Sequence, residues 1–222
     1  MPRLARIIVE GYPHHITQRG NNKQNTFLED ADYQAYLEFL ENYRKKYNLG
    51  ILSYCPMPNH IHISVLPTTT NSLAKTLRAC HMRYSQYFNR KYERIGHLWQ
   101  SRFYSCPMEE IHLYSTLKYI ENNPVRAKLV KKAEDWKWSS ARSHLGIEKG
   151  IISLLNIHEF LDIVNWKEYL HFDNKNTGEE IELLKKHTYS GKPMGKEKFI
   201  ENLTKNFGDK ARWLPVGRHP KK

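Results

Sequence analysis

The sequence predicts an α+β fold, in which an antiparallel sheet carries helices on one face and a small helical accessory region follows. Three observations lead to this fold class. Apolar residues make up 40% of the 222-residue chain, which is enough for a packed core. Segments with the two-residue alternation of strands are interleaved with segments of helical spacing. Short connections rich in Gly, Pro and Asn separate them.

The first part of the chain predicts strand, helix, strand, strand. Residues 6–19 are dominated by β-branched and aromatic residues, which favour a strand or a bent pair of short strands. A helix is predicted from Asp30 to about Tyr47, because its apolar residues recur at helical spacing. Residues 51–57 and 60–66 predict two strands, joined by a tight connection at Pro58-Asn59.

The next part predicts helix, strand, helix. Residues 72–92 predict a helix that carries five Lys or Arg and no acidic residue. Residues 97–106 predict a fourth strand, and residues 108–122 a helix that stops before Pro124. This order is typical of a ferredoxin-like split βαβ sheet with helices on one face. An unrelated α+β sandwich has the same order, so the order alone leaves that alternative open.

The character of the chain changes after Val130. An aromatic segment at 136–141 is expected to close the first domain, and residues 151–170 are expected to be helical. Residues 175–222 are strongly basic and end in a segment punctuated by Pro and Gly, which predicts a flexible basic end. The predicted domains are therefore 1–146 and a helical, basic accessory region at 147–222.

Composition narrows the class of partner and the compartment. The formal net charge is +12, which favours a polyanionic partner such as nucleic acid, although solubility alone also explains moderate charge. The three cysteines, Cys55, Cys80 and Cys106, form neither a disulfide framework nor a zinc motif. No apolar stretch is long enough for a membrane helix, and the start does not resemble a signal peptide. A cytoplasmic protein without a membrane partner is expected.

Two short patterns carry candidate chemistry. On a strand, His60 and His62 point to the same face, where two imidazoles can chelate one divalent ion or position a phosphate. On a helix, Tyr119 and Asn123 are four residues apart and share a face, which holds a nucleophile beside an amide oxygen. Each pattern alone is equally typical of an ordinary strand face or helix end, so the argument depends on their combination.

The combination of motifs resembles a known family. The motifs are Met57-Pro-Asn-His-Ile-His62, Trp99-Gln-Ser-Arg-Phe103, and a block that runs from Tyr119 through Asn123-Pro124 to Val130. Together they resemble the HUH-class tyrosine transposases (Y1) of the insertion-sequence type, and above all their REP-associated relatives. The resemblance covers about residues 5–145, and the segment 191–199 is similar to the accessory region of one branch of that group.

The resemblance implies a DNA strand transferase. His60 and His62 would bind a divalent metal, Mg²⁺ or Mn²⁺, and Tyr119 would attack DNA. Asn123 matches the position of the third metal ligand, although insertion-sequence members more often have glutamine there. Tyr114 is a competing nucleophile, but it is out of register with the Asn-Pro pair.

The implied activity is cleavage and rejoining of single-stranded DNA through a 5′-phosphotyrosine link, in transposition or repeat processing. The expected partner is single-stranded DNA with hairpin or palindromic ends, in the nucleoid of a bacterial cytoplasm. Family members include dimers and monomer-like forms, so a homodimer is one of two expectations.

Further residues are predicted to bind DNA. The acid-free helix offers Lys75, Arg78 and Arg83 to phosphates, or merely to water. Trp99, Gln100 and Arg102 combine a stacking ring, an amide and a guanidinium group, and these suit unstacked bases. Arg19 and Arg126 are additional candidates.

Two other functions compete with strand transfer. A non-catalytic nucleic-acid-binding module could use the same fold, because fold does not determine function. A metal-dependent nuclease could use water in place of Tyr119, and it would then release its product without a protein adduct.

Overall fold

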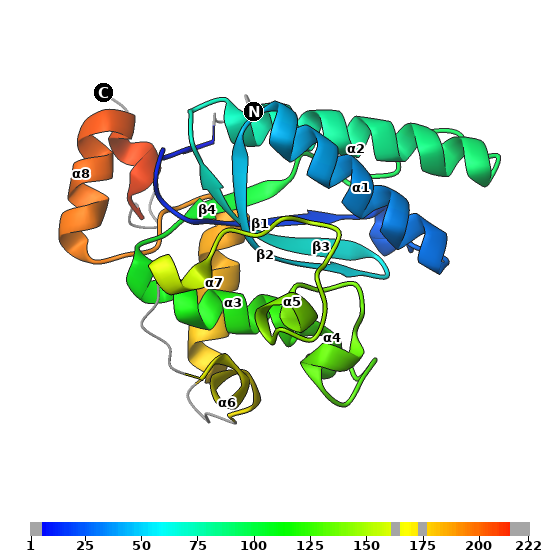
Figure 1. The fold of residues 1–222 in the computed structure, drawn as a ribbon. Coiled ribbons are helices and arrows are strands. Elements are labelled where there is room, and N and C mark those ends of the chain that lie inside the picture. Colours follow the sequence, from blue (N-terminus) through cyan, green and yellow to red (C-terminus); the bar gives the residue numbers. More distant parts are fainter. Residues whose placement is uncertain (1–5, 161–164, 173–176, 214–222) are drawn as a thin grey trace.

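The structure is a computed structural model, and it describes residues 6–160, 165–172 and 177–213 (Figure 1). Within these residues the strands are β1 (His14–Arg19), β2 (Leu49–Met57), β3 (His60–Pro67) and β4 (Tyr104–Pro107). The α-helices are α1 (Asp30–Lys46), α2 (Ser72–Lys91), α3 (Leu113–Glu121), α4 (Asn123–Arg126), α5 (Ala141–His144), α6 (Trp166–His171), α7 (Thr177–Ser190) and α8 (Glu197–Phe207).

The four strands form one antiparallel sheet in the order β2-β3-β1-β4. The register of the central pair places Thr17 opposite His62 and Arg19 opposite His60. Met57 pairs with His60, so Pro58 and Asn59 make the tight connection that the sequence predicts. This sheet confirms the predicted α+β fold of the ferredoxin-like type.

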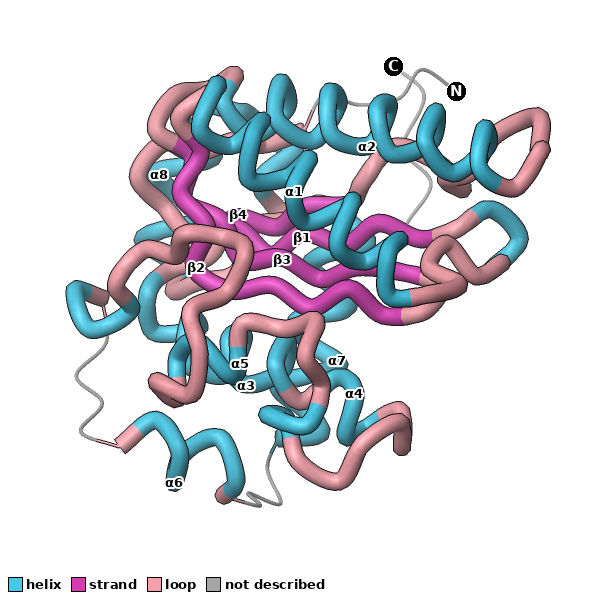
Figure 2. The backbone as a smooth tube through the Cα atoms, turned by 45° about the vertical axis from the view of Figure 1, so that its right-hand side comes forward, coloured by secondary structure: helices cyan, strands magenta, loops and turns pink. Residues whose placement is uncertain are grey.

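Helices cover both faces of the sheet (Figure 2). The sequence predicts helices on one face only, and this part of the prediction is wrong because the chain also packs α3 and α7 against the second face. α1 and α2 lie together on the first face, where they pack on the apolar side of β3 that includes Ile61 and Ile63. The opposite face is covered by α3, which contacts β2 and β3, and by α7, which contacts β4 and β1. Because side chains alternate along a strand, His62 lies on the α3 side of the sheet, between two isoleucines that face α1 and α2.

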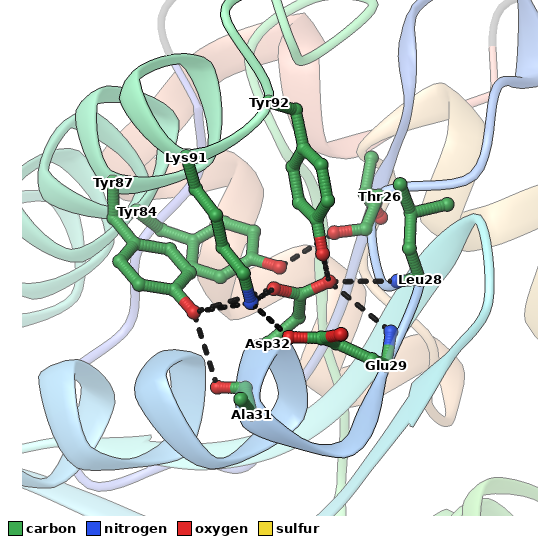
Figure 3. Close-up of polar contacts among 9 residues, drawn as sticks. All are labelled: Thr26, Leu28, Glu29, Ala31, Asp32, Tyr84, Tyr87, Lys91 and Tyr92. Carbon is green, nitrogen blue, oxygen red and sulfur yellow. Dashed lines mark hydrogen bonds and ion pairs between the residues drawn. The ribbon is translucent and has the colours of Figure 1, made fainter.

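A buried carboxylate joins α1 to the end of α2 (Figure 3). Asp32 accepts hydrogen bonds from Lys91 Nζ at 2.8 Å, from Tyr92 Oη at 2.8 Å and from the backbone nitrogen of Leu28 at 2.8 Å. Burial opposes ionisation of this side chain, but these donors outweigh it and lower the pKa of Asp32. The two long helices are thereby held together at one end.

The fourth strand is shorter than the sequence predicts. Only Tyr104–Pro107 forms β4, and the expected strand over 97–103 is reduced to a single bridge between Gly20 and Trp99. The physical reason is packing, because Leu98, Trp99 and Phe103 all pack against the core cluster under α2 instead of alternating between the two faces of a sheet.

The helix predicted over 108–122 is divided. A short 3-10 turn at Glu110–His112 precedes α3, which ends at Glu121, before Pro124 as predicted. The chain then begins the single turn α4, and Pro124 stands in its first turn, where its missing N–H is not needed. Asn123 therefore belongs to α4 rather than to the helix that carries Tyr119.

The C-terminal part packs on the sheet and on the N-terminal segment. The aromatic segment closes over α1 as expected, with Trp138 stacked on Tyr33 at 5.0 Å between ring centroids. The expected helix over 151–170 is wrong for most of its described part, which forms only a short turn at Ile157–Glu159 and the start of α6. The apolar residues of this segment lie in irregular chain and cover the core, and Ile152 and Ile157 are two of them.

The accessory region is helical in α7 and α8, as predicted. Phe199 of α8 packs with Ile7 of the N-terminal segment. The basic end at 214–222 lies outside the described residues, and the division into domains 1–146 and 147–222 stays a prediction. No helix in the described ranges has the length and apolar character needed to cross a bilayer.

Candidate active site

Two histidines of β3 project from the α3 side of the sheet. Their ring centroids are 5.0 Å apart and the rings are nearly perpendicular, at 84°. His60 is half-buried and His62 is 5% exposed. The predicted pairing of these two imidazoles on one strand face is therefore present in the fold.

Both rings make a hydrogen bond through Nδ1. His60 Nδ1 lies 2.6 Å from Asn59 Oδ1, and His62 Nδ1 lies 3.0 Å from Nε2 of His15. Burial, reinforced by the charge of Arg19, lowers the pKa of His60 to about 4. Burial also holds the pKa of His62 well below its usual value, and the neighbouring His60 and His15 lower it further. At neutral pH both rings are neutral, and Nε2 is the nitrogen that can act as a ligand.

Tyr119 of α3 packs its ring edge-on against His62. The centroids are 5.2 Å apart with an angle of 83°, and the side chain is 5% exposed. Burial raises the pKa of the Tyr119 phenol, whereas the charge of Arg126 and hydrogen bonds from Arg126 and Asn123 lower it. The Arg126 guanidinium carbon lies 4.9 Å from the centroid of the Tyr119 ring. The phenol is thus protonated at rest and has a cation beside it.

Asn123 stays beside Tyr119 although a helix break separates them. Its amide nitrogen donates to the backbone oxygen of Tyr119 at 2.9 Å and approaches that of Ile120 at 3.4 Å. The side chain is 8% exposed. Because the nitrogen is engaged, the amide oxygen is the atom that could bind a cation.

The donor set at this site fits a divalent ion of the transition or hard type. Within the described ranges, no three His, Cys, Asp or Glu side chains converge as a metal site. A metal would therefore depend on two neutral imidazoles, His60 and His62, together with oxygen ligands such as an amide or water. Imidazole nitrogen with amide oxygen is a donor set that Mn²⁺ accepts.

A cavity of about 600 Å³ lies beside Tyr119, between α3, α4, α6 and α7. Apolar and aromatic side chains form much of its wall, among them Tyr169 and Phe172. Cationic side chains lie in the same wall, namely Lys118, Arg126, Lys131 and Lys132. Flat apolar walls with nearby cations match the two parts of a nucleotide, its base and its phosphate.

Residues 9–123, more than half of the chain, match the family model described as "Transposase IS200 like". The chain belongs to the IS200-like transposase family. This membership places it among enzymes of DNA transposition. It also confirms the resemblance to tyrosine transposases that the sequence motifs indicate.

Two solved structures are similar to this transposase. One is described as a REP-associated tyrosine transposase bound to a REP hairpin; it is 20% identical, with a TM-score of 0.55, over 74% of this chain and 96% of that one. The other is a putative transposase from Deinococcus radiodurans, 17% identical, with a TM-score of 0.38, over 55% of this chain and 97% of that one. At this identity the first match supports the fold. No curated protein matches the chain significantly.

The transposase fold brings together six of the predicted site residues. They are His60, His62, Tyr119, Asn123, Arg19 and Arg126. Arg19 stands opposite His60 on β1, and its charge lowers the pKa of both histidines after the larger effect of burial. Tyr114, the competing nucleophile, instead packs against Tyr169 with 5.9 Å between ring centroids.

The other predicted DNA-binding residues of the transposase are not grouped around Tyr119, although the backbone nitrogen of Gln100 donates to the backbone oxygen of Arg19 at 2.9 Å. Lys75, Arg78 and Arg83 are exposed on α2, which covers the opposite face of the sheet. Trp99 packs with the core under α2 and donates Nε1 to the backbone oxygen of His81 at 3.2 Å. Gln100 and Arg102 are exposed in the turn before β4.

Sequence reasoning does not identify two residues of the transposase site, His15 and Thr188. His15 stacks on His62 with 5.2 Å between centroids, and Thr188 Oγ1 lies 2.7 Å from its other ring nitrogen. Strand alternation does place His15 on the same face as Thr17 and Arg19, which is a usable signal. The sequence carries no sign of the contact with Thr188, 173 residues away.

Proposed function

We propose that the protein cleaves and rejoins single-stranded DNA, with Tyr119 as the nucleophile. The observation that carries this proposal is the arrangement around the phenol, which has His62 at its edge and Arg126 over its ring. A phenol with a raised pKa is a poor nucleophile by itself. The Arg126 charge favours the phenolate, and the same cation suits the anionic phosphate that approaches it.

The histidine pair is assigned to a divalent ion, Mg²⁺ or Mn²⁺. His60 and His62 would hold it through Nε2, and Asn123 would add its amide oxygen. Such an ion, when bound, neutralises the scissile phosphate and stabilises the charge that develops during transfer. The chain itself supplies neutral imidazoles, a nucleophile on a rigid helix and two arginines, Arg19 and Arg126, around the same point.

The reaction proposed is a pair of transesterifications. The Tyr119 oxygen forms a bond to phosphorus, and the phosphorus–O3′ bond breaks. The phenol proton is transferred through solvent to the departing 3′ oxygen. The products are a 5′-phosphotyrosine and a free 3′-hydroxyl. A 3′-hydroxyl then attacks the phosphotyrosine and regenerates the phenol. The number of phosphoester bonds is unchanged, so the cycle needs no nucleoside triphosphate.

The proposed substrate is single-stranded DNA with hairpin or palindromic ends. The cavity beside Tyr119 supports this substrate, because an unstacked base can pack on Tyr169 and Phe172 with its phosphate near Lys131 and Lys132. The similar transposase described as bound to a REP hairpin also supports a hairpin-bearing DNA. The reaction would serve transposition of an element or processing of repeats, according to which DNA carries the hairpin.

The test is covalent trapping. The protein is incubated with Mn²⁺ and end-labelled single-stranded DNA that bears a hairpin, and adducts are separated on a denaturing gel. We expect an adduct with the wild type and none with Tyr119→Phe. Tyr114→Phe is the matched control, since it removes one hydroxyl from the same helix, and it should retain the adduct.

The remaining outcomes separate the competing functions. An adduct that survives Tyr119→Phe contradicts the proposal. Cleavage without any adduct would instead indicate a hydrolytic nuclease that uses water. Tight binding of every hairpin tested with no strand cleavage would indicate a non-catalytic nucleic-acid-binding module.

A further inference from the structure

Helix α7 contributes a buried hydroxyl to the candidate site, although it lies outside the residues that match the family model. Thr188 is in the last turn of α7 and is 1% exposed. Its Oγ1 lies 2.7 Å from Nδ1 of His15, and Nε2 of His15 lies 3.0 Å from Nδ1 of His62. These three side chains form a continuous buried chain of hydrogen bonds from α7 to β3.

The direction of each hydrogen bond follows from the first donor. The Thr188 hydroxyl donates to the backbone oxygen of Leu184 at 2.7 Å. A hydroxyl has one proton, so toward His15 it can only accept. His15 therefore carries a proton on Nδ1, and the lone pair on its Nε2 accepts from His62. His62 in turn carries its proton on Nδ1, which leaves the lone pair on Nε2.

The packing holds this arrangement in place. The rings of His15 and His62 are stacked with an angle of 2° between their planes, and the edge of each meets the Tyr119 ring. His15 is 1% exposed, so water does not compete for either of its nitrogens.

We propose that Thr188 and His15 are positioning residues that keep His62 in the Nδ1-protonated tautomer, with Nε2 free as a ligand; this inference rests on the proposed role of His62. The hydrogen bond that the second nitrogen of a ligand histidine makes sets that histidine's tautomer. Here the acceptor at the end of the chain of hydrogen bonds comes from the accessory region. The docking of α7 is thereby coupled to the ligand state of β3.

Removal of the Thr188 acceptor is expected to let His62 adopt the Nε2-protonated tautomer. In Thr188→Val, His15 has no partner for a proton on Nδ1, and it can carry the proton on Nε2 instead. It then donates to His62, whose proton moves to Nε2 and blocks the ligand lone pair. Thr188→Ser retains the hydroxyl and should behave as the wild type.

The experiment reads the tautomer directly. Proton–nitrogen correlation spectra of ¹⁵N-histidine-labelled, metal-free protein at pH 7 distinguish the two tautomers of His62. We expect the Nδ1–H form in the wild type and in Thr188→Ser, and a shift toward Nε2–H in Thr188→Val. Calorimetry with Mn²⁺ should find the affinity of Thr188→Val about tenfold weaker or more.

A matched control exists on the neighbouring helix. Thr204 of α8 makes the same hydrogen bond to the residue four positions earlier, Ile200, at 2.7 Å, and its Oγ1 accepts from Arg212 rather than from a histidine. Thr204→Val should leave both readouts unchanged. An unchanged His62 tautomer in a folded Thr188→Val protein would overturn the proposal.

A second pair of variants keeps the test decisive if Thr188→Val does not fold. His15→Gln retains an oxygen that can accept from His62, whereas His15→Leu does not. We expect the Nδ1–H form of His62 in the first and its loss in the second; the same tautomer in both contradicts the relay. Because these measurements use neither DNA nor activity, a missing Tyr119 adduct would overturn the proposed function and leave this result standing.

Discussion

At the scale of single residues, the site is defined by how burial changes protonation. Burial lowers the pKa of His60 and His62 and raises that of Tyr119, so all three side chains are neutral near pH 7. Neutral imidazoles are good ligands, whereas a neutral phenol is a poor nucleophile. The chemistry therefore depends on the cation that is in contact with the phenol, Arg126.

Arg126→Met is expected to lower the rate of adduct formation at saturating DNA by at least about tenfold, because it removes a preorganised charge beside the reacting oxygen. Arg126→Lys keeps the charge and should recover part of the rate. The measurement is single-turnover formation of the covalent adduct. Arg90→Met, which removes one charge from α2, is the control and should react at the wild-type rate. Equal rates for Arg126→Met and wild type would exclude this role.

At the scale of elements, the two long helices on the far side of the sheet depend on one buried carboxylate. Asp32 is 0% exposed and accepts hydrogen bonds from Lys91 of α2, from Tyr92 after that helix and from Leu28 before α1 (Figure 3). A buried carboxylate that loses its charge leaves these donors imperfectly matched. The cluster is thus a determinant of how α1 and α2 pack.

Asp32→Asn is expected to lower the free energy of unfolding by about 3 kcal/mol, as observed when a buried ion pair is broken. Asp30→Asn is a matched control two residues away, since Asp30 pairs with Lys137 at an exposed position. It should change stability by less than about 1 kcal/mol. Urea unfolding followed by circular dichroism measures both. A similar decrease in the two variants would contradict the role of burial.

At the scale of the whole molecule, basic residues occupy both sides of the sheet. The sequence leaves open whether the cations of α2 face phosphate or only water, and the structure places α2 and Tyr119 on opposite faces. The cavity beside Tyr119 has its own cations, Lys131 and Lys132. If Tyr119 is the nucleophile, as proposed, a bound strand is expected to contact this second set of cations.

Charge reversal can decide between the two surfaces. Lys131→Glu with Lys132→Glu should weaken binding of single-stranded DNA and reduce the salt dependence of log K by about 0.7 for each phosphate that the variant no longer neutralises. The same reversal on α2, Lys75→Glu with Arg78→Glu, should change both quantities less. Fluorescence anisotropy at several salt concentrations measures them. A larger effect of the α2 pair would assign the strand to that face.

Local patterns in the sequence are enough to specify the order of the elements, the strand face shared by His60 and His62, and the motif around Tyr119. These features depend on periodicity over a few residues and on a contiguous motif, so they are readable without coordinates. The family is also readable, because the blocks around His62, Trp99 and Tyr119 occur in a characteristic order. The start of β4 and the start of the helix before Pro124 are less well predicted, whereas the proline makes the end of that helix predictable.

Which distant side chains meet depends instead on the tertiary structure. Strand pairing in the order β2-β3-β1-β4 places His15 against His62, and the docking of α7 on β1 and β4 brings Thr188 to the same point. The same packing directs the half-buried Trp99 toward the core under α2, away from the face that carries Tyr119. Such contacts join residues up to 173 positions apart, and no local pattern in the sequence specifies them.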